Sequence, residues 1–90
     1  MKKNFYAIMD RANGTLIGTL MANNDVVACQ RTMNGLPEEV DKKFFSLVCA
    51  GTLDDETLEM HSDKRFVCKF DEMDAFIDRE MARIDAEGNI

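Results

Sequence analysis

The first part of the chain has the residue pattern of two strands joined by a tight turn. Residues 4–9 combine aromatic and aliphatic side chains, which favour an extended backbone. Residues 10–14 end in Asn-Gly, which readily supplies the positive φ angles of a hairpin, and Asp10 can accept hydrogen bonds from the loop amides. Residues 15–21 are therefore the expected returning strand, with Gly18 at a bulge.

A second group of strands is predicted in the middle of the chain. Residues 43–49 form a dense apolar run, which suits a strand at the centre of a sheet. A turn at 54–57 and a break at 61–63 are expected before the last strand, which spans 65–70. The buried face of that strand is expected to carry Phe66, Cys68 and Phe70, and its wetter face Arg65, Val67 and Lys69.

Two helices are predicted from apolar residues at helical spacing and from their end signals. The first opens at 23–25, where Asn or Asp can cap the free amides, and it stops at the Asn-Gly of 34–35. A loop at 36–41 follows, with one helical turn begun at Pro37. The second helix is capped by Asp71. Its apolar face comprises Met73, Phe76, Ile77, Met81 and Ile84.

The order of these elements is strand, strand, helix, strand, one or two strands, and helix. Because hairpins dominate this order, we predict an α+β protein with a four- or five-strand, mainly antiparallel sheet and two helices packed on one face. Ninety residues suit one hydrophobic core, so residues 1–90 are expected to form a single domain. A domain of this size is marginally stable alone, which leaves a homodimer open.

The acidic charge is concentrated near the C-terminus. The chain has a formal net charge of −6, and residues 71–87 account for −5 of it through seven acids and two arginines. An acidic chain is a poor generic ligand for nucleic acid, but the nearly neutral remainder can present a local basic face. The acidic helix is either a solvated face or a docking surface for a basic protein partner, and both alternatives stay open.

Residues typical of catalysis and of metal binding are scarce. Cys29, Cys49 and Cys68 are odd in number and far apart, which is unlike a zinc site and suits reduced, buried side chains. His61 stands alone, and the dispersed glycines form no phosphate loop. We therefore expect no enzyme activity, no cofactor and no metal. Neither a signal peptide nor a membrane span is apparent, so the expected compartment is the cytoplasm.

Aromatic and basic side chains share the predicted strands. An antiparallel sheet with both helices on one side leaves its other face open, where rings can stack on unpaired bases and Lys or Arg can hold phosphates. Tyr6 and Phe44 are the rings expected to be exposed, because polar Asn4 and Ser46 share their respective faces. The expected contacts to single-stranded DNA are made by Tyr6, Phe44, Lys3, Arg11, Lys43 and Arg65.

Three stretches of the chain carry a pattern that recurs in one protein family. They are the opening residues 1–11, the helix opening Asn24-Asp25 with Ala28, and residues 47–57, which read LVCAGTLDDET. In this order and spacing they resemble the small nonstructural proteins of gokushovirus-type microviruses, which are single-stranded DNA phages. The resemblance implies a phage accessory protein in the bacterial host cytoplasm that binds single-stranded DNA during genome replication or packaging.

The chain departs from that family at several positions. Residues 18–21 stand where the family commonly has a Pro-Phe segment, and Leu58 stands where it has glycine. Gln30 and Cys49 occupy positions at which basic residues are common. Two phosphate contacts that the resemblance implies are therefore missing. The alternative function is a non-enzymatic protein-binding module, a homodimer in one form, whose acidic C-terminal helix engages a basic host or viral partner.

Overall fold

A computed structural model describes residues 1–36 and 41–88 and arranges them as one antiparallel sheet with two helices. The strands are β1 (Lys2–Asp10), β2 (Thr15–Ala22), β3 (Phe45–Asp54) and β4 (Met60–Lys69), in the spatial order β2-β1-β3-β4. The helices are α1 (Asp25–Asn34) and α2 (Met73–Gly88), and short 3₁₀ helices η1 (Lys42–Phe44) and η2 (Phe70–Glu72) precede β3 and α2. This architecture confirms the α+β prediction, with four strands.

Local hydrogen bonds explain where the two hairpin turns lie. The carboxylate of Asp10 accepts from the backbone N–H of Ala12 at 2.9 Å, and Gly14 takes a φ of 66°. In the β3–β4 turn, Asp54 Oδ1 accepts from the N–H groups of Glu56 and Thr57 at 2.9 and 3.2 Å. Both turns were predicted, because the side chains that fix them lie within three residues of the amides they bind.

The ends of α1 also follow local chemistry. Asn24 Oδ1 accepts from the N–H of Val27 at 2.9 Å, which caps the helix, and the N–H of Gly35 donates to the carbonyl of Arg31. The expected helical turn at Pro37 lies outside the described residues. The prediction that Asp71 caps the last helix is wrong, since this residue lies inside η2 and the helix begins at Met73.

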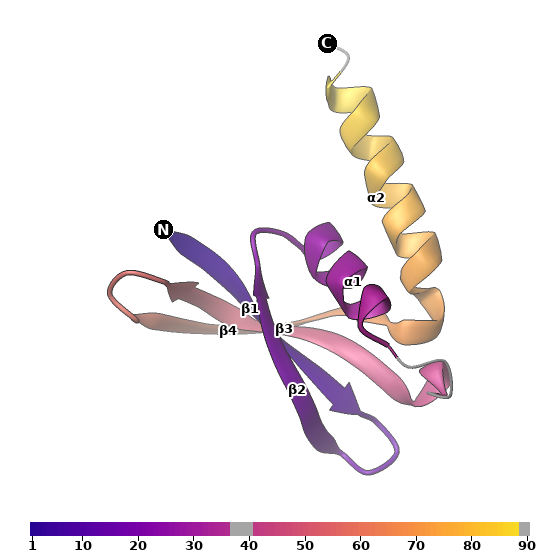
Figure 1. The fold of residues 1–90 in the computed structure, drawn as a ribbon, viewed down its shortest axis with the longest axis horizontal. Helices are drawn as coiled ribbons and strands as arrows, with labels where there is room; N and C mark the ends of the chain where they lie inside the picture. Colours follow the sequence, from indigo (N-terminus) through magenta and orange to yellow (C-terminus); the bar gives the residue numbers. More distant parts are fainter. Residues whose placement is uncertain (37–40, 89–90) are drawn as a thin grey trace.

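The hydrophobic core lies between one face of the sheet and both helices. Figure 1 shows α1 and α2 on the same side of the strands, with the C-terminal part of α2 running away from them. The buried cluster joins residues of β1, β2, β3, β4, α1, η2 and α2. Its members are Tyr6, Ala22, Ala28, Cys29, Leu47, Cys49, Cys68, Phe70 and Met73. No described helix covers the opposite face, which we call the open face.

The pairing between β3 and β4 is irregular, and the two strands approach closely at one point. The expected break at 61–63 does not occur, because β4 runs continuously from Met60 and absorbs the irregularity in register shifts. Gly51, at one of these shifts, has a φ of 149°, and a Cβ built on it would overlap the carbonyl oxygen of His61. A residue without a side chain is therefore required where the two strands approach this closely.

Candidate nucleic-acid interface

Two adjoining depressions lie at the end of the sheet where β1 ends and β3 begins. One is lined by Arg11, Ala12, Lys43, Phe44, Lys69 and Asp71, and the other by Met9, Arg11, Ser46, Val48, Lys64, Phe66 and Lys69. They are continuous, since they share Arg11 and Lys69. We call their charged and aromatic members the basic–aromatic surface: Arg11, Lys43, Phe44, Lys64, Phe66 and Lys69.

The first half of this surface is held by the contact between the β1–β2 loop and η1. The N–H of Arg11 donates to the carbonyl of Phe44 at 2.7 Å, which fixes the loop against the 3₁₀ helix. The Lys43 ammonium lies 5.1 Å from the centre of the Phe44 ring, and Asp41 accepts from the Lys43 N–H. Phe44 is 43% exposed, so its expected exposure is confirmed.

The second half depends on a β-bulge at Val67. Leu47 pairs with Cys68, but the next residue, Val48, pairs with Phe66, so Val67 is the extra residue. Because side chains alternate between the faces of a strand, one inserted residue moves those before it to the other face. The prediction that Phe66 is buried is therefore wrong: its ring is 58% exposed on the open face.

The same bulge turns Arg65 away from the open face and toward the helices. Its guanidinium makes two hydrogen bonds to the carboxylate of Asp25, at 2.7 and 2.8 Å. This guanidinium, together with the Tyr6 hydroxyl, holds the pKa of the Asp25 carboxyl below its ordinary value of 3.8 despite partial burial. Arg65 therefore joins β4 to the first turn of α1 and does not belong to the basic–aromatic surface.

Tyr6 lies in the core, where its ring is inaccessible. Its hydroxyl donates to Asp25 Oδ1 at 2.6 Å and accepts from the side-chain amide of Asn4 at 2.9 Å. Burial, followed by the neighbouring carboxylate, raises the pKa of the phenol. The expectation of an exposed Tyr6 is wrong. It took the polar Asn4 as a sign that this face of β1 meets solvent, whereas the Asn4 amide binds the buried Tyr6 hydroxyl.

Lys3 lies at the far end of β1 from Arg11. Its ammonium is 3.5 Å from the carboxylate of Asp55 in the β3–β4 turn. Of the six residues predicted from the sequence, the structure thus brings together Arg11, Lys43 and Phe44. Lys64, Phe66 and Lys69 complete the surface. Lys69 was expected on the wetter face of its strand, but Phe66 was expected in the core, so the sequence did not group the three.

Three of the four cations of the basic–aromatic surface have no ion-pair partner among the described residues, and the surface also holds an unsatisfied hydroxyl. Among the described residues no acidic side chain forms an ion pair with Arg11, Lys64 or Lys69, although Asp71 lines one of the depressions. Ser46, on the floor beside Met9, is 3% exposed, and its hydroxyl has no hydrogen-bond partner in the described part of the chain. This arrangement can bind a flat ring, an anion and one polar group side by side.

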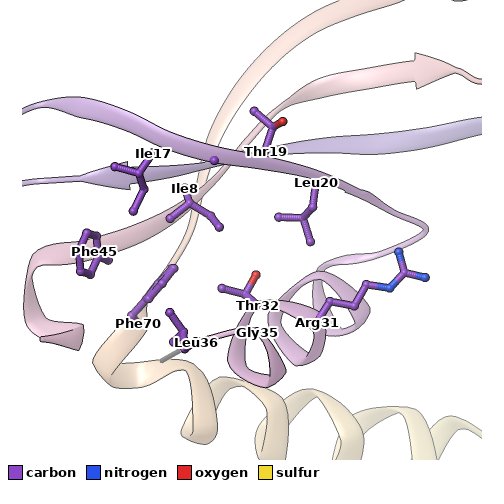
Figure 2. Close-up of a pocket in the computed structure, with 11 residues that line it drawn as sticks. Ile8, Ile17, Thr19, Leu20, Arg31, Thr32, Gly35, Leu36, Phe45 and Phe70 are labelled. Atoms are coloured by element: carbon purple, nitrogen blue, oxygen red, sulfur yellow. The ribbon is translucent and has the colours of Figure 1, made fainter. Parts of the chain in front are cut away.

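An apolar cavity of about 380 Å³ lies on the other side of the sheet, between β2 and the C-terminal end of α1 (Figure 2). Ile8, Leu20 and Phe70 form much of its wall, and Ile17 reaches it from the edge of the sheet. Arg31 lines it too, but one of its guanidinium N–H groups donates to the carbonyl of Met21 at 2.8 Å. The described lining of the cavity is thus mainly hydrophobic.

The cysteines are buried and unpaired, as the sequence predicted. Desolvation raises the pKa of the Cys29 thiol to about 12 and also raises that of Cys68, so neither is an activated nucleophile. Within residues 1–36 and 41–88, no three His, Cys, Asp or Glu side chains come together as metal ligands would. Over the same residues, no helix is long and apolar enough to cross a membrane.

Comparison with protein-family models, with curated protein sequences and with solved structures finds no match to this chain.

Proposed function

We propose that the protein binds single-stranded DNA through the basic–aromatic surface. The observation that carries the proposal is the pair of exposed rings, Phe44 and Phe66, bordered by four cationic side chains on an otherwise acidic protein. Bases of a single strand are free to stack on such rings, whereas those of a duplex are already stacked on each other. The surface therefore favours single strands.

The cations are placed to hold the phosphates between stacked bases, although Lys43 must first leave Asp41, whose carboxylate lies 3.7 Å from its ammonium. Arg11 and Lys69 line both depressions, and Lys43 and Lys64 each line one of them. Each phosphate that they neutralise releases counterions, which supplies most of the affinity in complexes of this kind. The acidic residues of α2 act against this attraction at long range, so binding is expected to be weak and sensitive to salt.

The buried hydroxyl of Ser46 adds a means of recognising a base edge. It lies on the floor between the two long, flexible side chains of Met9 and Lys69, with which Ser46 pairs across the sheet. Movement of these side chains would expose the hydroxyl to a base lying on Phe66. A nucleotide bound there would satisfy a polar group that otherwise has no partner among the described residues.

The resemblance to gokushovirus nonstructural proteins supports the choice of DNA as the ligand. The backbone at Leu58, where this chain departs from the glycine of that family, is of the kind that glycine favours. Leu58 has a φ of 64°, in the left-handed region that favours glycine, and the family has glycine at this position. We accordingly propose that binding serves the replication or packaging of a single-stranded phage genome.

Replacement of Phe66 by alanine tests the site. Phe66→Ala should weaken binding of a labelled single-stranded oligonucleotide about tenfold or more in fluorescence anisotropy, because stacking contributes ~1–3 kcal/mol per base. Met60→Ala is the matched control, since Met60 is also an exposed apolar residue of β4 but lies at the other end of the strand. Equal affinities for Phe66→Ala and the unaltered protein would remove this surface from the proposal.

A further inference from the structure

The two edges of the sheet differ in how they are protected. Natural edge strands usually carry charges, prolines or bulges that prevent pairing with other chains. β4 follows this rule, with Asp63, Lys64 and Arg65 in its middle and two register shifts in its pairing. β2, at the opposite edge, reads TLIGTLMA; it has one register shift in its pairing with β1 but no charged residue and no proline.

β2 also leaves large apolar side chains in solvent. Leu16 and Ile17 are 58% and 53% exposed, and Thr19 farther along the strand is exposed as well. Leu16 pairs with Met9 and therefore shares the open face, whereas Ile17 reaches the apolar cavity on the helix side. No described strand pairs with the outer edge of β2, although the Arg31 guanidinium donates to the carbonyl of Met21 near the end of this strand.

We propose that β2 pairs antiparallel with β2 of a second copy of this chain. The pairing is related by a two-fold axis, so it closes after two copies and each strand meets its own image. Like charges that face each other across two strands are destabilising, and β2 has none. The same absence of charge offers nothing to attract a charged peptide, which favours an identical strand as the occupant.

The size of the contact indicates a reversible dimer. An eight-residue strand spans roughly 27 Å at about 3.4 Å per residue, and its backbone bonds would be joined by burial of Leu16 and Ile17 from each copy. Protein–protein interfaces that bury little surface area are generally weak, so the dimer is expected to dissociate on dilution. The result is a continuous eight-strand sheet, with both basic–aromatic surfaces on the same open face.

Sedimentation velocity over a wide range of protein concentration tests the proposal. The mass should rise from the monomer value of 10.2 kDa toward twice that value as concentration increases. Thr19→Lys, which places a charge near the middle of β2, should weaken dimerisation at least about tenfold. Ser62→Lys is the matched control, because Ser62 is an exposed hydroxyl residue on the β4 edge, and it should leave dimerisation unchanged.

Hydrogen exchange provides a second readout that needs no variant. The outward amides of β2 should become protected as protein concentration rises, while those of β4 should not change. A mass of 10.2 kDa at every concentration would overturn the proposal, as would equal dimerisation of Thr19→Lys and the unaltered protein. The DNA titration of Phe66→Ala is independent of these results, because Phe66 lies on β4, at the edge of the sheet opposite to β2.

Discussion

At the scale of single residues, side chains that act on neighbouring amides were predictable and long-range partners were not. Asp10 and Asn24 bind backbone groups within three residues, so their roles follow from local sequence. Tyr6, Asp25 and Arg65 form one network across three elements, with partners 19 and 40 residues apart. Nothing in the sequence indicated that Arg65 pairs with a carboxylate instead of meeting solvent, because that depends on the bulge beside it.

Asp25→Asn should reduce the free energy of unfolding in a pH-dependent manner. The folded-state pKa of Asp25 is below its ordinary value of 3.8, so the ionised carboxylate stabilises the fold above that pH. This stabilisation is lost as the pH falls through the folded-state pKa. Urea unfolding should show a loss of about 1–2 kcal/mol at neutral pH that shrinks below pH 3.8.

The control for this experiment is Asp78→Asn, which removes an exposed carboxylate from α2. Substitutions at such positions usually change stability by less than about 0.5 kcal/mol. A loss for Asp25→Asn that stays constant down to strongly acidic pH would contradict the assignment of the ion pair as its cause.

At the scale of elements, periodicity and turn residues predicted four strands and two helices, and the register shift beside Gly18 agrees with the bulge expected there. The continuous course of β4 and its irregular pairing were not predicted. The hairpin turns and the antiparallel arrangement follow from turn residues and alternation, whereas the order β2-β1-β3-β4 is known only from the structure. A bulge has no reliable signal in one sequence, and the bulge at Val67 exchanged the faces of Phe66 and Arg65. Arg65 was lost from the predicted site for this reason, whereas Tyr6 was lost to the core and Lys3 to the far end of β1.

Gly51→Ala should destabilise the fold more than an equivalent change at a turn. Its new Cβ would overlap the His61 carbonyl oxygen of the neighbouring strand, so β3 and β4 must separate locally, at a cost of about 3 kcal/mol. Gly14→Ala also meets a positive φ, but nothing lies within 4 Å of its Cβ, so a loss of only about 1 kcal/mol is expected. Similar melting curves for the two variants would contradict the close approach at Gly51.

At the scale of the whole molecule, most of the negative charge lies away from the surface that is proposed to bind DNA. The acids are concentrated in α2 and in the β3–β4 turn, whereas Arg11, Lys43, Lys64 and Lys69 gather at the other end of the sheet. The net charge of −6 alone argues against nucleic-acid binding, and only the arrangement in space reverses that argument. The sequence predicted the asymmetry of charge, while the fold determines which cations act together.

The most direct test of the central claim is a titration of labelled single-stranded and duplex oligonucleotides at several salt concentrations. With four cations engaged, the logarithm of the affinity for single strands should fall with the logarithm of salt concentration at a slope of about −3. Single strands should bind more tightly than duplex at every salt concentration, because only they offer free bases to Phe44 and Phe66. Absence of binding even at low salt would contradict the account and transfer attention to a basic protein partner of α2.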